Sequence, residues 1–230
     1  MDNLISIIAI VAGLILVVAS FKLYSSFYRT GKFSTTQFIA RVAIFGAMSA
    51  ILYVVPIFNI SLPFFPSFLS LHFDEVPVFI AGFAYGPLSA IAAIAIKTLI
   101  KLPFTSTMCV GEATDFLLSS LYVGMATLIY KKKRNLKGVA IAFACSTVVQ
   151  VIAAMLLNVY VMIPFYMNLF GMTEEGLLAV MQMAIPAIKD ISWSYALLAV
   201  LPFNLLKDAI VLTATFIVYR SVHKLLRFEK

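Results

Sequence analysis

The chain of 230 residues is 63% hydrophobic and only 12% charged, with a mean hydropathy of +1.04. Soluble domains contain about 45–50% apolar and about 25% charged residues, so this composition excludes an ordinary soluble domain. It also excludes a disordered chain, which needs low hydrophobicity. The apolar residues run continuously instead of alternating, which argues against an outer-membrane barrel. We therefore expect an all-α protein, a polytopic membrane helix bundle.

Seven apolar runs predict transmembrane segments, because about 20 apolar residues cross a bilayer. The first has no Lys or Arg before it and no cleavage pattern after it, so it predicts an uncleaved helix and not a secretory signal. A loop rich in Pro and Phe follows the second run, and a connector rich in Pro, Thr and Ser precedes the fifth. The seven runs are residues 4–21, about 38–58, 76–85, 88–102, 116–130, 139–165 and 195–219.

The basic residues predict the orientation of these segments. A model with the N-terminus outside and the C-terminus in the cytoplasm gives three cytoplasmic segments, which are residues 22–41, residues 131–137 and the tail from Arg220. These segments hold thirteen of the seventeen Lys and Arg residues, as the positive-inside rule requires. The net charge of +7 is thus explained by topology, and we expect no nucleic-acid partner. The four remaining basic residues are Lys97, Lys101, Lys189 and Lys207.

Several polar residues lie within the apolar runs, where charge costs several kcal/mol unless it is paired or faces water. Lys207 lies about a dozen residues from either end of its segment, too deep for easy snorkelling. Asn204 shares its helix face at a spacing of three residues. We expect both to bind a ligand, together with Asn158, for which hydrogen bonding between helices is the alternative. Lys97 also lies within an apolar run, whereas Glu112 opens one and has a helix cap as its alternative role.

Aromatic side chains gather around the predicted outer loop and at the end of the sixth run. Aromatic belts are common at membrane interfaces, but a stiff loop of this composition is also suited to cover a flat aromatic ligand. A planar and partly polar ligand would find aromatic surfaces for stacking and amide and ammonium groups for hydrogen bonds. The residues are Phe64, Phe65, Phe68, Phe73, Tyr160, Phe165 and Tyr166.

Catalytic patterns are missing from the sequence. It has no Gly-x-x-x-x-Gly-Lys-[Ser/Thr] phosphate loop and no Gly-x-Ser-x-Gly elbow. Two histidines, His72 and His223, are too few for a metal site, and the pair Glu174-Glu175 falls in a predicted outer loop without a histidine nearby. We therefore expect no enzyme and no metal. A membrane enzyme is the alternative from another class, as is a stand-alone secondary transporter, for which a convincing internal repeat is lacking.

Four sets of residues together resemble a known family. They are residues 68–87 (FLSLHFDEVPVFIAGFAYGP), Ile96-Lys97 with Gly111-Glu112 and Phe116, residues 158–166 (NVYVMIPFY), and Pro202-Phe-Asn-Leu-Leu-Lys207. This pattern resembles the substrate-binding S components of energy-coupling factor (ECF) vitamin transporters, and most closely their riboflavin-specific branch. The chain departs from the family's usual residues at Thr98, Asp115 and positions 72, 74 and 75. Another vitamin, such as pantothenate, is the alternative within the family.

The resemblance implies a six-helix substrate-binding domain over residues 36–230, preceded by an extra helix and basic linker over residues 1–35. Such proteins bind a vitamin near the outer face of the bacterial cytoplasmic membrane and perform no chemistry, so riboflavin would be cargo and not a cofactor. They dock on a membrane subunit, EcfT, which two cytoplasmic ATPases drive. The implied ligand-binding residues are Phe68, Leu71, Lys97, Glu112, Asn158, Asn204 and Lys207. The implied docking stripe of small residues is Ala43, Gly46, Ala47 and Ala50, spaced for close helix approach.

Overall fold

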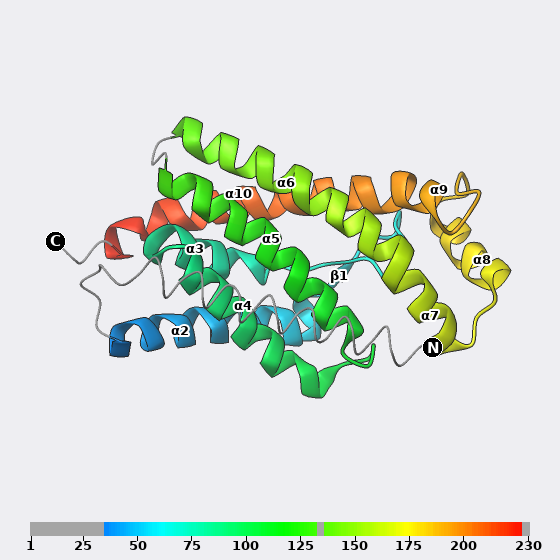
Figure 1. The fold of residues 1–230 in the computed structure, drawn as a ribbon, viewed down its shortest axis with the longest axis horizontal. Helices are drawn as coiled ribbons and strands as arrows, with labels where there is room; N and C mark the ends of the chain where they lie inside the picture. The colour runs from blue at the N-terminus through cyan, green and yellow to red at the C-terminus, as the bar shows by residue number, and fades with distance from the viewer. Residues whose placement is uncertain (1–34, 133–135, 227–230) are drawn as a thin grey trace.

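The computed structural model describes residues 35–132 and 136–226, so the apolar run at 4–21 lies outside the described residues. Five described segments are long and apolar enough to cross a membrane, which confirms the helical multi-pass architecture. The long helices run side by side along the longest axis of the molecule (Figure 1). The five segments are Thr35–Val54, Pro87–Phe104, Val110–Lys132, Lys137–Phe170 and Trp193–Ser221.

The helices of the bundle are α2 (Thr35–Val54), α3 (Glu75–Tyr85), α4 (Pro87–Lys101), α5 (Val110–Lys132), α6 (Leu136–Leu157) and α10 (Leu201–Leu226). Two π-helical segments interrupt the last two spans: η3 (Asn158–Met162) joins α6 to α7 (Ile163–Phe170), and η4 (Ala196–Val200) joins α9 (Trp193–Tyr195) to α10. Short 3₁₀ turns lie at η1 (Pro56–Phe58) and η2 (Leu102–Phe104). In Figure 1, α7, α8 (Glu174–Ala184) and α9 lie at one end of the bundle, which we name the α8 end.

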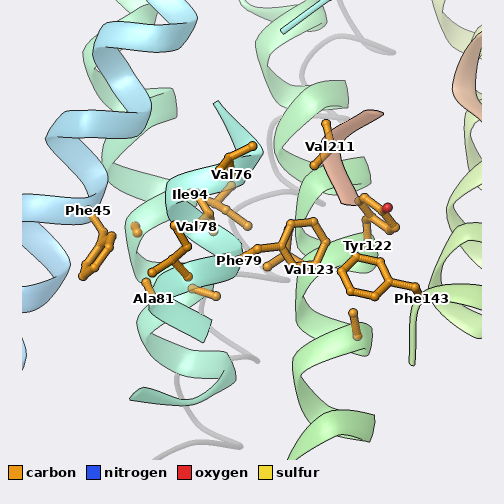
Figure 2. Close-up of a cluster of buried hydrophobic side chains, with 14 of the residues drawn as sticks. Phe45, Val76, Val78, Phe79, Ala81, Ile94, Tyr122, Val123, Phe143 and Val211 are labelled. Carbon is orange, nitrogen blue, oxygen red and sulfur yellow. The ribbon is translucent and has the colours of Figure 1, made fainter. Parts of the chain in front are cut away.

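Helix α3 is shorter than a membrane span and lies in the middle of the bundle. Its 11 residues extend about 16 Å at 1.5 Å per residue, about half of a bilayer core. The run at 76–85 is therefore not a full span of its own. Phe79 of α3 packs edge-on against Tyr122 of α5, with ring centroids 4.9 Å apart, and against Phe143 of α6 at 5.1 Å (Figure 2). The aromatic core thus fixes α3 among its neighbours.

The chain before α3 enters the bundle as a loop instead of a helix. It contains two short antiparallel strands, β1 (Ile60–Ser61) and β2 (Ser70–Leu71), with Ile60 opposite Leu71. Phe65, Leu69 and Leu71 of this loop are buried, and Leu69 packs in a second core cluster with residues of α8 and α10. One side of the Pro- and Phe-rich segment is therefore part of the protein interior, whereas Phe64 is 55% exposed.

Two glycines explain local features of this region. Gly86 has φ of 99° and, with Pro87 after it, makes the turn between α3 and α4 that the Gly-Pro pair predicts. Gly82 lies so close to α5 that a Cβ atom there would sit 2.4 Å from Cγ2 of Thr127. A side chain at position 82 would therefore require Thr127 of α5 to shift.

The segment after α7 differs from the expected outer loop, because it contains helix α8 (Glu174–Ala184). The Thr173 side chain caps this helix by accepting a hydrogen bond from the Gly176 amide at 3.2 Å. Leu177 and Met181 are buried on its inner face. The helix escaped sequence analysis because it is amphipathic and too short for a span search, although the Thr cap and Glu174-Glu175 in its first turn are helix-start signals.

A buried ion pair and hydrogen bonds attach the start of α3 to α4 and α5. The Lys97 ammonium of α4 donates to the Asp74 carboxylate, to Asp115 of α5 at 2.9 Å and to the Ser119 hydroxyl at 3.3 Å. Ser119 in turn donates to Oε1 of Glu75 at 3.0 Å. Asp74, Glu75 and Lys97 are at most 1% exposed. This network holds the end of the loop 59–74 at the centre of the bundle.

Replacing Lys97 with Met should destabilise the protein strongly. The change leaves the Asp74 and Asp115 carboxylates without their cation, and breaking a buried pair typically costs about 3–5 kcal/mol. Lys101→Met serves as the control, because Lys101 is one turn away on the same helix but partly exposed. Thermal unfolding in detergent should show a clear fall in Tm for Lys97→Met only. Equal Tm values for the two variants would show that the network contributes nothing to stability.

Candidate functional site

Asn204 and Lys207 of α10 point into the bundle from one helix face, as their spacing predicts. They are 6% and 8% exposed. The Lys207 ammonium donates to Oε1 of Glu75 at 3.1 Å. Asn204 donates from Nδ2 to the Val200 carbonyl at 2.8 Å, and its Oδ1 accepts from Nε2 of Gln150 on α6 at 3.0 Å. We call Glu75, Gln150, Asn204 and Lys207 the amide–lysine cluster.

Asn158 lies further toward the α8 end. It begins the π-helical turn η3, eight residues after Gln150, which is about 12 Å along the helix axis. Its Nδ2 donates to the Ala154 carbonyl at 2.9 Å, and its Oδ1 accepts from the fully buried Tyr195 hydroxyl at 3.1 Å. The contact joins the two helices that carry π-helical turns.

Aromatic rings surround Asn158 and the loop before α3. The Phe68 ring of this loop lies 5.8 Å from the Tyr166 ring and 6.0 Å from the Tyr195 ring, measured between centroids. We call Phe68, Tyr166 and Tyr195 the aromatic cluster. Leu71 is buried in β2 at 4% exposure. Phe68 is half-buried, so the loop presents part of an aromatic surface that its neighbours do not cover.

Lys97 and Glu112 are occupied by the protein itself. An ammonium has three N–H groups, and Lys97 directs its hydrogen bonds at Asp74, Asp115 and Ser119. Glu112 opens α5 as expected and accepts from the Thr105 hydroxyl at 2.8 Å and the Thr107 hydroxyl at 2.9 Å. Glu112 thus holds the connector between α4 and α5. Its hydrogen bonds go to this connector and not to the amide–lysine cluster.

The small-residue stripe of α2 divides between two faces of the helix. Gly46 and Ala50 are buried, and a Cβ atom at Gly46 would lie 2.8 Å from Cγ2 of Ile96 on α4. These two residues are explained by packing of α2 on α4 inside the bundle. Ala43 and Ala47 are exposed, so only they present small side chains outward.

Three residues of the site were missed by the sequence analysis: Glu75, Gln150 and Tyr195. Gln150 is polar within a long apolar run, the same signal that identified Asn158, but unlike Asn158 it lies in none of the segments that resemble the family. Glu75 lies in the family-like segment 68–87, but the resemblance implies a ligand-binding role there only for Phe68 and Leu71. Tyr195 was treated as the start of a span. Their roles depend on which side chain they meet across the bundle, which the sequence pattern does not contain.

His72 does not add a further cation to this region. Its ring lies edge-on against Tyr53, with centroids 5.3 Å apart. Burial lowers the pKa of the His72 imidazole below its ordinary value, because desolvation disfavours the charged form. The ring is therefore neutral at neutral pH. Among the residues that the structure describes, no three His, Cys, Asp or Glu side chains come together as metal ligands.

The arrangement is suited to binding. Lys207 and Asn204 have N–H groups beyond those used within the protein, since an ammonium carries three and an amide two. The aromatic cluster lies toward the α8 end, and Asn158 lies beside it. A ligand with a flat ring system and hydrogen-bonding edges matches such a combination of surfaces.

Comparison with known proteins identifies the family. Residues 37–219 match the family model described as "ECF transporter, substrate-specific component". The riboflavin transporter RibU of Staphylococcus aureus (strain TCH60) is 27% identical over 187 residues, covering 81% of this chain and 92% of that protein. The riboflavin transporter FmnP of Bacillus subtilis (strain 168) is 28% identical over 182 residues, covering 77% and 88%.

A solved structure shares the fold. It is described as "Structure and mechanism of the S component of a bacterial ECF transporter", and it matches with a TM-score of 0.67 at 23% identity over 84% of this chain and 99% of that chain. The fold match and the family model over residues 37–219 thus agree. This chain belongs to the family of substrate-specific components of ECF transporters.

Proposed function

We propose that the protein is the riboflavin-binding S component of an ECF-type importer in the bacterial cytoplasmic membrane. The observation that carries the proposal is the aromatic cluster toward the α8 end of the bundle together with the buried amide–lysine cluster, whose Gln150 precedes Asn158 by about 12 Å along the helix axis. The isoalloxazine of riboflavin is flat and has a polar imide edge, and its ribityl chain carries hydroxyls. Relatives of similar length are named riboflavin transporters, which supports the same ligand.

The ligand contacts that we propose are Phe68, Leu71, Asn158, Asn204 and Lys207. Asn204 and Lys207 retain N–H donors for ligand oxygens. Phe68 offers a partly exposed ring for stacking. Lys97 and Glu112 act indirectly in this proposal, by holding the loop 59–74 and the connector after α4 in place.

The energy for import comes from partners in this proposal. The sequence has no phosphate loop, so EcfT and two cytoplasmic ATPases would drive transport. The exposed Ala43 and Ala47 of α2 are our proposed docking contacts. The start of α2 and the ends of α5 and α10 lie opposite the α8 end (Figure 1), and Arg41, Lys131 and Arg220 are in the parts of these helices near those ends. By the positive-inside rule this end would face the cytoplasm, with the chain's N-terminus outside and the α8 end receiving the vitamin.

Riboflavin binding can be measured by quenching of flavin fluorescence with purified protein in detergent. Asn204→Ala and Lys207→Ala should each raise Kd at least tenfold, because each leaves a buried ligand oxygen without its donor, at a cost of about 1–3 kcal/mol or more. The matched controls are Asn168→Ala and Lys189→Ala. Asn168 is exposed and donates to the carbonyl four residues earlier, as Asn204 does, and Lys189 is exposed.

The two controls should bind riboflavin as tightly as the parent. A parent protein that is colourless and quenches no flavin fluorescence would contradict riboflavin as the ligand, and pantothenate would then be tested by calorimetry. If Lys207→Ala binds as tightly as the parent, Lys207 serves structure alone and the proposed contact is wrong.

Transport by the isolated chain distinguishes an S component from a stand-alone transporter. Reconstituted alone in liposomes, the protein should bind radiolabelled riboflavin without accumulating it, even with ATP present. Co-reconstitution with an EcfT subunit and its two ATPases should give ATP-dependent accumulation. Concentrative uptake by the isolated chain would contradict the proposal and favour a secondary transporter.

A further inference from the structure

Gln150 carries a buried hydrogen-bond acceptor that the protein leaves unused. The side chain is on α6 and is 1% exposed. Its Nε2 donates to Oδ1 of Asn204 at 3.0 Å, whereas its Oε1 has no hydrogen-bond partner among the described residues. A buried acceptor without a donor loses its hydrogen bonds to water and gains none in return. We therefore expect a hydrogen-bond donor to bind to this atom.

The orientation of the Gln150 amide follows from its neighbour. Asn204 donates from Nδ2 to the Val200 carbonyl of its own helix at 2.8 Å, which requires its Oδ1 to be the atom that faces α6. An acceptor at that place requires Gln150 to present its NH₂ group. The carbonyl oxygen of Gln150 is thereby the atom that remains free.

Two side chains of α10 near this acceptor have N–H groups to spare. Asn204 has a second N–H beyond the one that it gives to Val200. Lys207 follows one turn later and has two N–H groups beyond the one that it gives to Glu75. The cluster therefore offers the donors of Asn204 and Lys207 and two acceptors without partners among the described residues, Oε1 of Gln150 and Oε2 of Glu75, of which Gln150 adjoins Asn204. The imide edge of an isoalloxazine has the complementary set, a carbonyl, an N–H and a second carbonyl.

We propose that Gln150 determines specificity by accepting the imide N–H of the flavin with its Oε1. Asn204 and Lys207 then donate to the two carbonyls that flank this N–H. This inference rests on the riboflavin-binding function proposed above and adds a requirement for the ligand, which must carry a hydrogen-bond donor between two acceptors. The opposite side of the ring system and the ribityl chain are then directed toward the α8 end, where Asn158 and Phe68 lie.

The test uses the full-length protein in detergent and two ligands, riboflavin and 3-methylriboflavin, in which a methyl group replaces the imide hydrogen. Kd is measured by fluorescence quenching for the parent, for Gln150→Leu and for the control Gln182→Leu. Gln182 is the matched residue on α8, with its Nε2 bonded to the Ile188 carbonyl at 2.8 Å. We expect the parent to bind the methylated flavin at least tenfold more weakly than riboflavin.

Gln150→Leu should bind riboflavin at least tenfold more weakly than the parent and should no longer distinguish the two flavins. Gln182→Leu should behave as the parent does. A residue that only positions Asn204 would weaken both flavins by the same factor and preserve the discrimination, and this outcome would overturn the proposal.

The ligand series remains decisive if Gln150→Leu does not fold. Gln150→Met then replaces it, and the parent alone also tests the inference: equal Kd values for the two flavins would overturn it. A parent that binds riboflavin while Gln150→Leu binds it equally well overturns only the role of Gln150. A parent that binds neither flavin overturns the proposed function and this inference with it.

Discussion

Charge buried among apolar helices is the constraint on which the rest of the structure depends. Asp74 and Glu75 lie at the start of α3, where carboxylates also complement the positive end of a helix. Lys97 from α4 and Lys207 from α10 approach them, and the Ser119 hydroxyl of α5 connects the two pairs. Because these groups need one another in a medium of low polarity, the loop 59–74 must end inside the bundle and α3 must begin there.

The two buried lysines have the same chemistry but different remaining capacity. All three donors of Lys97 are directed at protein groups, so its contribution is to hold helices together. Lys207 gives one donor to Glu75, and Asn204 beside it keeps one N–H, so these side chains can still meet a ligand. Residue type and depth suggested a ligand for both lysines. The count of donors and acceptors separates a structural ammonium from one that can also bind.

The sequence predicted what depends on long-range hydrophobicity and local spacing. The long spans, the turn at Gly86-Pro87 and the shared face of Asn204 and Lys207 follow from such patterns. The short α3 and the added α8 differ from expectation, because a search for long apolar runs recognises apolar length alone. It therefore interprets the apolar but short α3 as a span and does not detect the amphipathic α8. The partners Glu75, Gln150 and Tyr195 were not predictable, since each meets its partner across the bundle at a sequence separation of at least 37 residues.

The π-helical turns η3 and η4 also limit how the chain can change in length. A π turn contains one residue more than an α turn, and each residue of an α-helix turns the face by about 100°. Deleting one residue of Ala196–Val200 would convert the π turn into an α turn of nearly the same rotation, so Tyr195 would still face Asn158. Deleting one of residues 201–203 would instead rotate Tyr195 by about 100° relative to Asn204 and Lys207. Related chains that keep both contacts can therefore lose a residue within the π turn but not within the α-helical turn that follows it.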